Sequence, residues 1–324
     1  MARKVLHSRA NAVFEDALGL IGWTPMVKIN RLTGQGDATI LAKLESYNIG
    51  GSLKDRICKY MIEVAEREGL LRKDMTILEA TSGNTGIGLA IVAAVKGYRL
   101  KIVMPDNVSI ERRRLLQALG AEVILTPGEK GTAGAIELAT SMFMKNPSKF
   151  FVPDQFNNPM NILAHYETTA REILEQTQGR PDMVVVGIGT SGTAMGVSKR
   201  LKEHNPSVKI VGVEPILGQR IQGLRNMREP FPPSLFDPKM LDERVYVTEA
   251  EAIYMAREMA RKEALVMGLS SGAVMSVAVK KARELGKGRT IVAILPDGGE
   301  RYLSTELYNP AYSPEGIIVC PDHE

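Results

Sequence analysis

The stretch "TILEATSGNTGIGLAIVAAVKGYRLKIVMP", residues 76–105, contains the pattern that decides the fold. Two short apolar runs, "TILEA" and "LKIVMP", lie on either side of a helical pattern over residues 87–96. Short runs rich in β-branched residues suit buried strands, and strands that alternate with helices are typical of parallel sheets covered on both faces. The stretch therefore predicts a β-α-β unit of an α/β protein.

The same alternation continues along the rest of the chain. Further apolar runs are "AEVILTP", "FFVPD", "DMVVVGIG", "VKIVGVEP" and "RTIVAILP", and further helical patterns cover residues 110–119, 133–144 and 249–262. The strands fall into two groups, separated by a mostly helical connection over residues 156–179. We therefore expect two three-layer α/β/α domains with mainly parallel sheets. The expected units are a smaller domain over 46–156, a larger domain over 10–45 plus 157–315, and a tail over 316–324.

Composition excludes several classes of protein. The 324 residues carry a net charge of +4 from intermingled acids and bases, so we expect no nucleic-acid partner. The two cysteines, Cys58 and Cys320, lie far apart in sequence, and the four histidines show no ligand spacing (His7, His165, His204, His323). We therefore expect neither a disulfide framework nor a metal site. The cysteine usage fits a reducing cytoplasm. No run is long and apolar enough to span a bilayer, so we expect neither secretion nor a membrane partner.

A lysine stands at an unusual place in "YNIGGSLKDRICKYMIEVAEREG", residues 47–69. The apolar residues Ile57, Met61 and Val64 recur at helical spacing, and Lys54 falls on the same face at the start of the helix. Such a lysine either extends its ammonium out to water or loses charge through burial, and the second outcome makes it a nucleophile. On this stretch alone both interpretations remain open.

In open parallel sheets, ligands bind beyond the carboxyl ends of the strands, so the strand-to-helix turns are candidate sites. The turn "EATSGNTG" places hydroxyl and amide groups at a helix start, where they suit a carboxylate or phosphate. The turn "MGLSSGAV" places Ser270 and Ser271 at another helix start. The first of these turns could equally be a simple helix cap, and the second, taken by itself, is interpreted as a helix cap.

The turn "VVVGIGTSGTAMG", residues 184–196, allows two interpretations. Gly187, Gly189 and Gly192 match G-x-G-x-x-G, and Glu214 ends the next strand where a ribose-binding acid belongs, which is typical of a dinucleotide site. The same turn also forms a compact set of amides and hydroxyls for a single phosphate group. A glycine motif alone does not decide between them.

At this point the sequence as a whole resembles the cysteine synthases (O-acetylserine sulfhydrylases), particularly the B type, of the tryptophan synthase β-like, fold type II pyridoxal phosphate family. The motifs that carry the resemblance are "GLIGWTPMVKIN", "GGSLKDR", "TSGNTG", "MPDNVSIERRRLLQALGAEVILTPG", "DQFNNPMN", "GIGTSGT", "GLSSGA" and "LPDGGERYLST". They cover nearly the whole chain in family order. Two departures are mild: "SGT" replaces "GGT" in the phosphate turn, and "NI" replaces "NP" at residues 48–49.

The resemblance implies a role for each matching residue. Lys54 would form the Schiff base with pyridoxal phosphate, Asn84 would contact the ring hydroxyl oxygen, and Ser270 would meet the pyridine nitrogen. The phosphate would be held by Gly189, Thr190, Ser191, Gly192 and Thr193, and the substrate carboxylate by Thr81, Ser82, Thr85 and Gln155. Arg225, in "LRNM", would meet the phosphate of a phosphorylated donor. Asp297 receives no role.

The implied reaction is β-replacement on O-acetyl-L-serine, or on O-phospho-L-serine, with sulfide as the nucleophile and L-cysteine as the product, in a homodimer. Alternatives with the same cofactor are a serine or threonine dehydratase and a cystathionine β-synthase. An NAD-binding oxidoreductase that uses "GIGTSG" and Glu214 is an alternative of a different class, as is a catalytically silent ligand-binding relative.

Overall fold

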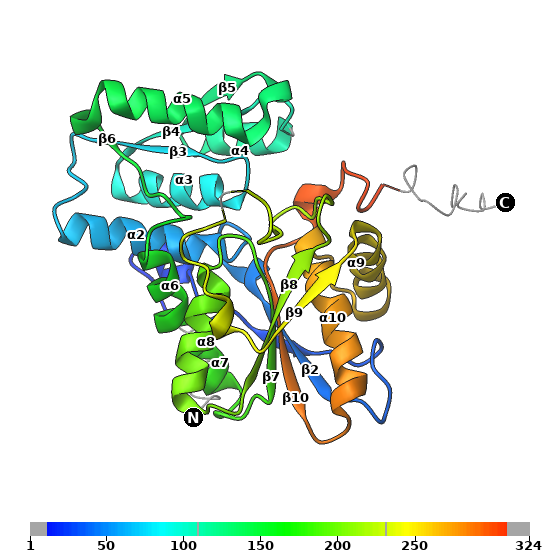
Figure 1. The fold of residues 1–324 in the computed structure, drawn as a ribbon. Helices are drawn as coiled ribbons and strands as arrows, with labels where there is room; N and C mark the ends of the chain where they lie inside the picture. Colours follow the sequence, from blue (N-terminus) through cyan, green and yellow to red (C-terminus); the bar gives the residue numbers. More distant parts are fainter. Residues whose placement is uncertain (1–11, 109, 231, 310–324) are drawn as a thin grey trace.

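The computed structural model describes residues 12–108, 110–230 and 232–309, and it contains two α/β units with a sheet in each (Figure 1). The expected tail over 316–324 lies outside the described residues, as do Cys320, His7, His323 and the ends of the expected larger domain, residues 10–11 and 310–315. The described helices include none that is long and apolar enough to cross a membrane.

The smaller sheet has four parallel strands in the order β5-β4-β3-β6. Its strands are β3 (Thr76–Ala80), β4 (Arg99–Pro105), β5 (Glu122–Thr126) and β6 (Phe150–Phe151). One face packs on α5 (Gly131–Lys145), and the other packs on α2 (Lys54–Arg67), α3 (Asn84–Lys96) and α4 (Ile110–Ala118) (Figure 1). Alternate residues of β3 supply the two cores, because successive strand side chains point to opposite faces: Ile77 faces α2 and α3, and Leu78 faces α5.

The larger sheet has six strands in the order β1-β2-β10-β7-β8-β9, and only β1 runs antiparallel to its neighbour. Its strands are β1 (Met26–Lys28), β2 (Thr39–Leu44), β7 (Met183–Gly187), β8 (Lys209–Pro215), β9 (Glu243–Val247) and β10 (Thr290–Leu295). Helices α9 (Glu249–Glu263) and α10 (Leu269–Leu285) cover one face, while α7 (Ala170–Gln176) and α8 (Gly192–His204) cover the other (Figure 1). The expected fold class of two three-layer units is therefore confirmed.

Three strands of the larger sheet were not predicted from the sequence: β1, β2 and β9. The reason is clearest in β2, where Lys43 interrupts the apolar run "TILAKL". In the structure Lys43 is fully buried, and its Nζ lies 2.6 Å from a carboxylate oxygen of Glu172. The predicted strand "FFVPD" shortens to two residues.

The helical connection over residues 156–179 contains α6 (Met160–Ala164), one π-helical turn (His165–Thr169) and α7. It follows the smaller sheet and precedes β7, so the order of units along the chain agrees with the sequence analysis. The exact domain boundaries, 46–156 and 10–45 plus 157–315, stay a prediction.

A buried ionic cluster joins the two units. Arg56 of α2 donates to Glu45, which follows β2, with 2.6 Å between Nε and Oε2. It also donates to Glu172 of α7, with 2.5 Å between Nη1 and Oε1. Burial would raise the pKa of Glu45, but the charge and hydrogen bonds of Arg56 reverse this effect and hold that pKa at about 2. The side chains of Arg56, Glu45 and Glu172 are at most 3% exposed.

We predict that Arg56→Ala lowers the free energy of unfolding by about 3–5 kcal/mol, because it leaves two buried carboxylates without their shared cation. Denaturant unfolding of the purified protein would measure the loss. Arg72→Ala is the control, since Arg72 pairs with Asp74 on the surface and should change stability by less than about 0.5 kcal/mol. Equal effects of the two variants would contradict a structural role for the buried cluster.

Candidate active site

The carboxyl ends of β2, β3, β7 and β10 lead into turns that meet between the two units. The turn after β10 lies against the start of α2, since the Leu53 N–H donates to the Pro296 carbonyl oxygen at 2.9 Å. Ser52 and Asp297 form an isolated antiparallel bridge at the same place. The helix that begins at Lys54 is thereby attached to the end of a central strand of the larger sheet.

Lys54 is partly buried at the first position of α2. Burial lowers the pKa of its ammonium to about 8, against the opposing influence of Cys58 and Asp297. Burial also raises the pKa of the Cys58 thiol well above its usual range. Burial raises the pKa of Asp297 as well, but hydrogen bonds from Asn84 and Tyr302 oppose that rise, so Asp297 is the nearby group that more readily carries a negative charge. Of the two interpretations of this lysine, the lowered pKa favours the buried amine, whose neutral fraction near neutral pH is much larger than that of an exposed lysine.

Residues 189–193 form a tight turn at the start of α8, which begins at Gly192. Within the described chain, their backbone N–H groups have no hydrogen-bonded protein acceptor. Ser191 has a left-handed backbone with φ of 71°. An array of free donors at the positive end of a helix suits a phosphate dianion. We call residues 189–193 the phosphate turn.

Two glycines allow this turn to pack closely. A Cβ on Gly189 would lie closer than 3.0 Å to the carbonyl oxygen of Gly223, and a Cβ on Gly192 would lie closer than 3.0 Å to Asn161 Oδ1. Gly223 in turn faces Ser270, whose Oγ is 3.4 Å from the position of a Gly223 Cβ. The phosphate turn and the start of α10, which carries Ser270, therefore lie near each other.

A chain of hydrogen bonds joins the phosphate turn to the turn after β3. Asn161 Nδ2 donates to Thr190 Oγ1 at 3.0 Å and to the Gln155 carbonyl oxygen at 2.7 Å. Thr85 Oγ1 donates to Gln155 Oε1 at 2.6 Å. Gln155 and Thr85 are thus brought together, and their binding of one carboxylate stays a prediction.

The remaining residues of the β3 turn are held by local contacts. Thr81 Oγ1 accepts from the Gly83 N–H at 3.2 Å, and the Ser82 carbonyl oxygen accepts from Arg112 at 2.9 Å. Thr193 Oγ1 lies 3.1 Å from Nε2 of the buried His165, whose pKa is lowered mainly by burial. The two turns are positioned by side chains that connect them to neighbouring helices.

Sequence reasoning missed several residues of this site. Asn84 Nδ2 donates to Asp297 Oδ2 at 2.8 Å, and Asn84 Oδ1 accepts from Arg301. Tyr302 also donates to Asp297 Oδ2, at 2.7 Å. Asn161, described above, was missed as well. The four missed residues are Asn161, in the motif "DQFNNPMN", and Asp297, Arg301 and Tyr302, in the motif "LPDGGERYLST". The motifs were a signal for their importance, but no sequence pattern indicated their contacts.

Glu214 does not lie free beside the glycine motif. It is fully buried, Arg244 Nε donates to its Oε1 at 2.5 Å, and the Met227 N–H donates to its Oε2 at 2.7 Å. These partners occupy the oxygens that a ribose would need, so Glu214 has a structural role. The dinucleotide interpretation loses its acidic residue.

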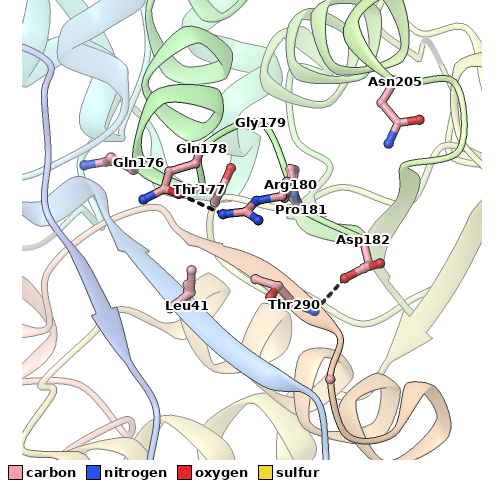
Figure 2. A pocket seen from close by; sticks show the side chains of 11 residues that line it. Leu41, Gln176, Thr177, Gln178, Gly179, Arg180, Pro181, Asp182, Asn205 and Thr290 are labelled. Atoms are coloured by element: carbon pink, nitrogen blue, oxygen red, sulfur yellow. Dashed lines mark hydrogen bonds between the residues drawn. The ribbon is translucent and has the colours of Figure 1, made fainter. Parts of the chain in front are cut away.

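A cavity of about 640 Å³ lies elsewhere in the molecule (Figure 2). Its lining includes Asp182 and Thr290, which stand at the amino ends of β7 and β10, together with Gln178 and Arg180 from the loop after α7. None of the predicted site residues lines this cavity. It is at the opposite end of the strands from the phosphate turn, and its size therefore says nothing about the predicted chemistry.

Among the described residues, no group of three or more His, Cys, Asp or Glu side chains could hold a metal ion.

The fold and the site together define a two-unit α/β enzyme scaffold with a desolvated amine, Lys54, and a turn suited to an anion. Comparison with known families agrees, because residues 17–297 match the family described as pyridoxal-phosphate dependent enzymes. This chain belongs to that family.

Individual relatives are similar over nearly their full lengths. A cysteine synthase from Staphylococcus aureus is 44% identical over 298 residues, which cover 90% of this chain and 96% of the relative. The structure of a cysteine synthase from Entamoeba histolytica has a TM-score of 0.87 at 41% identity and covers 92% of this chain and 91% of its own. A hydrogen sulfide-producing enzyme from Fusobacterium nucleatum has a TM-score of 0.85 at 43% identity, with 91% and 100% coverage.

These similarities confirm the family that the sequence motifs indicated, and they do not favour the dehydratase, cystathionine β-synthase or NAD-binding alternatives. The residues present also fit the cofactor of the family. The free N–H groups of the phosphate turn suit its phosphate, and the partly neutral amine of Lys54 suits its carbonyl carbon.

We predict that Gly189→Ala weakens the affinity for pyridoxal phosphate by about tenfold or more, because the added methyl group forces the phosphate turn away from Gly223. Titration of the apoenzyme with the cofactor, followed by absorbance, measures this affinity. Gly36→Ala is the control, since a Cβ there meets no atom within 4 Å. Unchanged affinity in Gly189→Ala would show that the turn does not need its close packing.

Proposed function

We propose that this protein is a cysteine synthase, which replaces the β-substituent of an activated L-serine with sulfide to give L-cysteine. The observation that carries the proposal is the position of Lys54, an amine with a pKa lowered to about 8, on a helix start between the turns of two sheets. The similarity to cysteine synthases over about nine tenths of the chain supports the choice of reaction.

When bound, pyridoxal phosphate supplies an electron sink that weakens the Cα–H bond of the amino acid and assists loss of its β-substituent. Lys54 Nζ would hold the cofactor, and after the donor displaces it, the same nitrogen would remove the Cα proton and later return it. A pKa near 8 suits both steps, because the amine can accept a proton and release it again close to neutral pH.

The other predicted site residues would bind and orient the cofactor and the substrate. The phosphate turn, Gly189 to Thr193, would hold the cofactor phosphate through backbone N–H groups. Ser270, a neutral partner for the ring nitrogen, would not enforce protonation of the ring as a carboxylate would. The substrate carboxylate would bind to the turn after β3 and its neighbour, namely Thr81, Ser82, Thr85 and Gln155.

We also infer that the enzyme is a cytoplasmic homodimer with the two domains outlined above. Support for the assembly is the family resemblance, and support for the compartment is the absence of paired cysteine spacing in the sequence. Sedimentation or light scattering of the purified protein would measure the assembly.

We predict that Lys54→Ala abolishes both the Schiff-base absorption band of the protein and cysteine formation from O-acetyl-L-serine and sulfide, while the fold remains intact. Alanine is tolerated at a helix start, but it offers no amine. Absorption spectra, product assay and circular dichroism provide the measurements. Lys59→Ala, which changes an amine on the same helix outside the predicted site, is the control. Turnover that survives in Lys54→Ala would contradict the proposed mechanism.

Arg225 is the residue that would recognise the phosphate of O-phospho-L-serine, the alternative donor. Its backbone N–H donates to the carbonyl oxygen of Ile188, the residue before the phosphate turn, at 2.8 Å. Its guanidinium donates to the Pro230 carbonyl oxygen and lies 3.4 Å from Glu229. These contacts anchor the loop, and an arginine here also suits the phosphate of O-phospho-L-serine. O-acetyl-L-serine remains our preferred donor.

If Arg225 recognises phosphate, Arg225→Ala should reduce kcat/KM for O-phospho-L-serine by about ten- to a hundredfold, the value of a charge-assisted hydrogen bond, and leave O-acetyl-L-serine nearly unaffected. Steady-state kinetics with both donors would distinguish phosphate recognition by Arg225 from a purely structural role in its loop. Arg220→Ala, an exposed arginine on the same loop, serves as the control. Equal losses with both donors would assign Arg225 to loop structure.

A further inference from the structure

Asn84 is held at both ends of its side-chain amide. Its Nδ2 donates to Asp297 Oδ2 at 2.8 Å, and its Oδ1 accepts from the Arg301 guanidinium. A carboxylate only accepts hydrogen bonds, and a guanidinium only donates them. Rotation of the amide by 180° would set donor against donor at Arg301 and acceptor against acceptor at Asp297. The amide therefore has a single allowed orientation.

The two residues that hold Asn84 are themselves fixed. Asp297 is 1% exposed, and Tyr302 donates to the same Oδ2 at 2.7 Å. Its Oδ1 has no hydrogen-bond partner among the described residues, and a Cβ on Gly268 would collide with that oxygen. Arg301 also donates to the Gly50 carbonyl oxygen at 2.7 Å, in the glycine pair that precedes Lys54. The clamp, Asp297 with Arg301 and Tyr302, thus joins the turn after β10 to the start of α2.

We infer that Asp297 is a positioning residue that, with Arg301, fixes Asn84 as a hydrogen-bond donor toward the cofactor ring. This inference rests on the proposed function, because the resemblance is what places Asn84 beside the ring oxygen. One N–H of Asn84 remains without a protein partner in the described chain, and the fixed orientation presents that N–H rather than the amide oxygen. A donor at this place favours an unprotonated ring oxygen, which accepts the hydrogen bond.

A positioning role of Asp297 differs measurably from a general structural role in the turn after β10. Asp297 also acts on Lys54 through its charge, and that effect is the same with or without the Asn84 amide. If Asp297 acts through Asn84 as well, its removal costs more while the Asn84 amide is present, so the effects of the two substitutions will not add. If it merely supports the turn after β10, its removal will cost the same in either background. A double-mutant cycle on cofactor binding separates these two cases.

The experiment titrates four apoenzymes with pyridoxal phosphate: wild type, Asp297→Ala, Asn84→Ala and the double variant. We expect Asp297→Ala to weaken binding by about tenfold, as for loss of one hydrogen bond to a charged group, and to reduce the visible absorption band of an unprotonated ring oxygen. In the Asn84→Ala background the same change should cost less than about twofold. An equal loss in both backgrounds would overturn the inference.

Two further variants keep the test decisive if Asp297→Ala folds poorly. Asp297→Asn retains an acceptor oxygen for Asn84 and should bind the cofactor within about threefold of wild type, even if thermal stability falls. Tyr302→Phe removes only the second donor to Oδ2 and should have a smaller effect than Asp297→Ala. Asp297→Asn binding as weakly as Asp297→Ala would overturn the inference. A wild-type protein that fails to bind the cofactor at all would instead refute the proposed function.

Discussion

Arg56 lies between Glu45 and Glu172, and these three buried side chains hold the first turn of α2, which carries Lys54, against the larger unit. The carboxylates belong to the segment after β2 and to α7, so one guanidinium attaches α2 to two elements of the larger unit. Buried ion pairs gain little net stability over apolar packing, but a misplaced partner leaves an uncompensated charge. The cluster therefore acts as a constraint on geometry: Lys54 can occupy its place only when all three elements are in position.

A second constraint follows from the first. Once α2 is attached, the turn after β10 lies against it, and Asp297 comes close to Lys54 and to Asn84 at the start of α3. The cost of burial at Lys54, visible in its lowered pKa, is reduced by the charge that Asp297 can carry. The candidate site thus consists of helix starts and strand ends from both sheets, and neither unit contains it alone.

The position of the site also explains why the cavity in Figure 2 is not part of it. Backbone N–H groups without partners collect at helix starts, and in parallel sheets these follow the carboxyl ends of strands. The cavity lies at the amino ends of β7 and β10. Close packing of Gly189 and Gly192 at the phosphate turn, rather than empty volume, marks the end of the sheet that carries the candidate site.

The sequence by itself determined the α/β class, the order of the two strand groups and the family. Apolar periodicity and turn motifs depend only on residues that are near one another in the chain, so they can be recognised without the structure. The sequence also identified Lys54 and the phosphate turn as candidates for the site.

The sequence did not reveal β2, since Lys43 interrupts the apolar run, and only the distant Glu172 makes that lysine compatible with a buried strand. Nor did it assign Asp297, whose partners Asn84 and Tyr302 lie at sequence separations of 213 and 5 residues. Glu214 seemed available for a ligand until the fold placed Arg244 against it. Such pairings depend on where separate elements meet, and only the tertiary structure decides that.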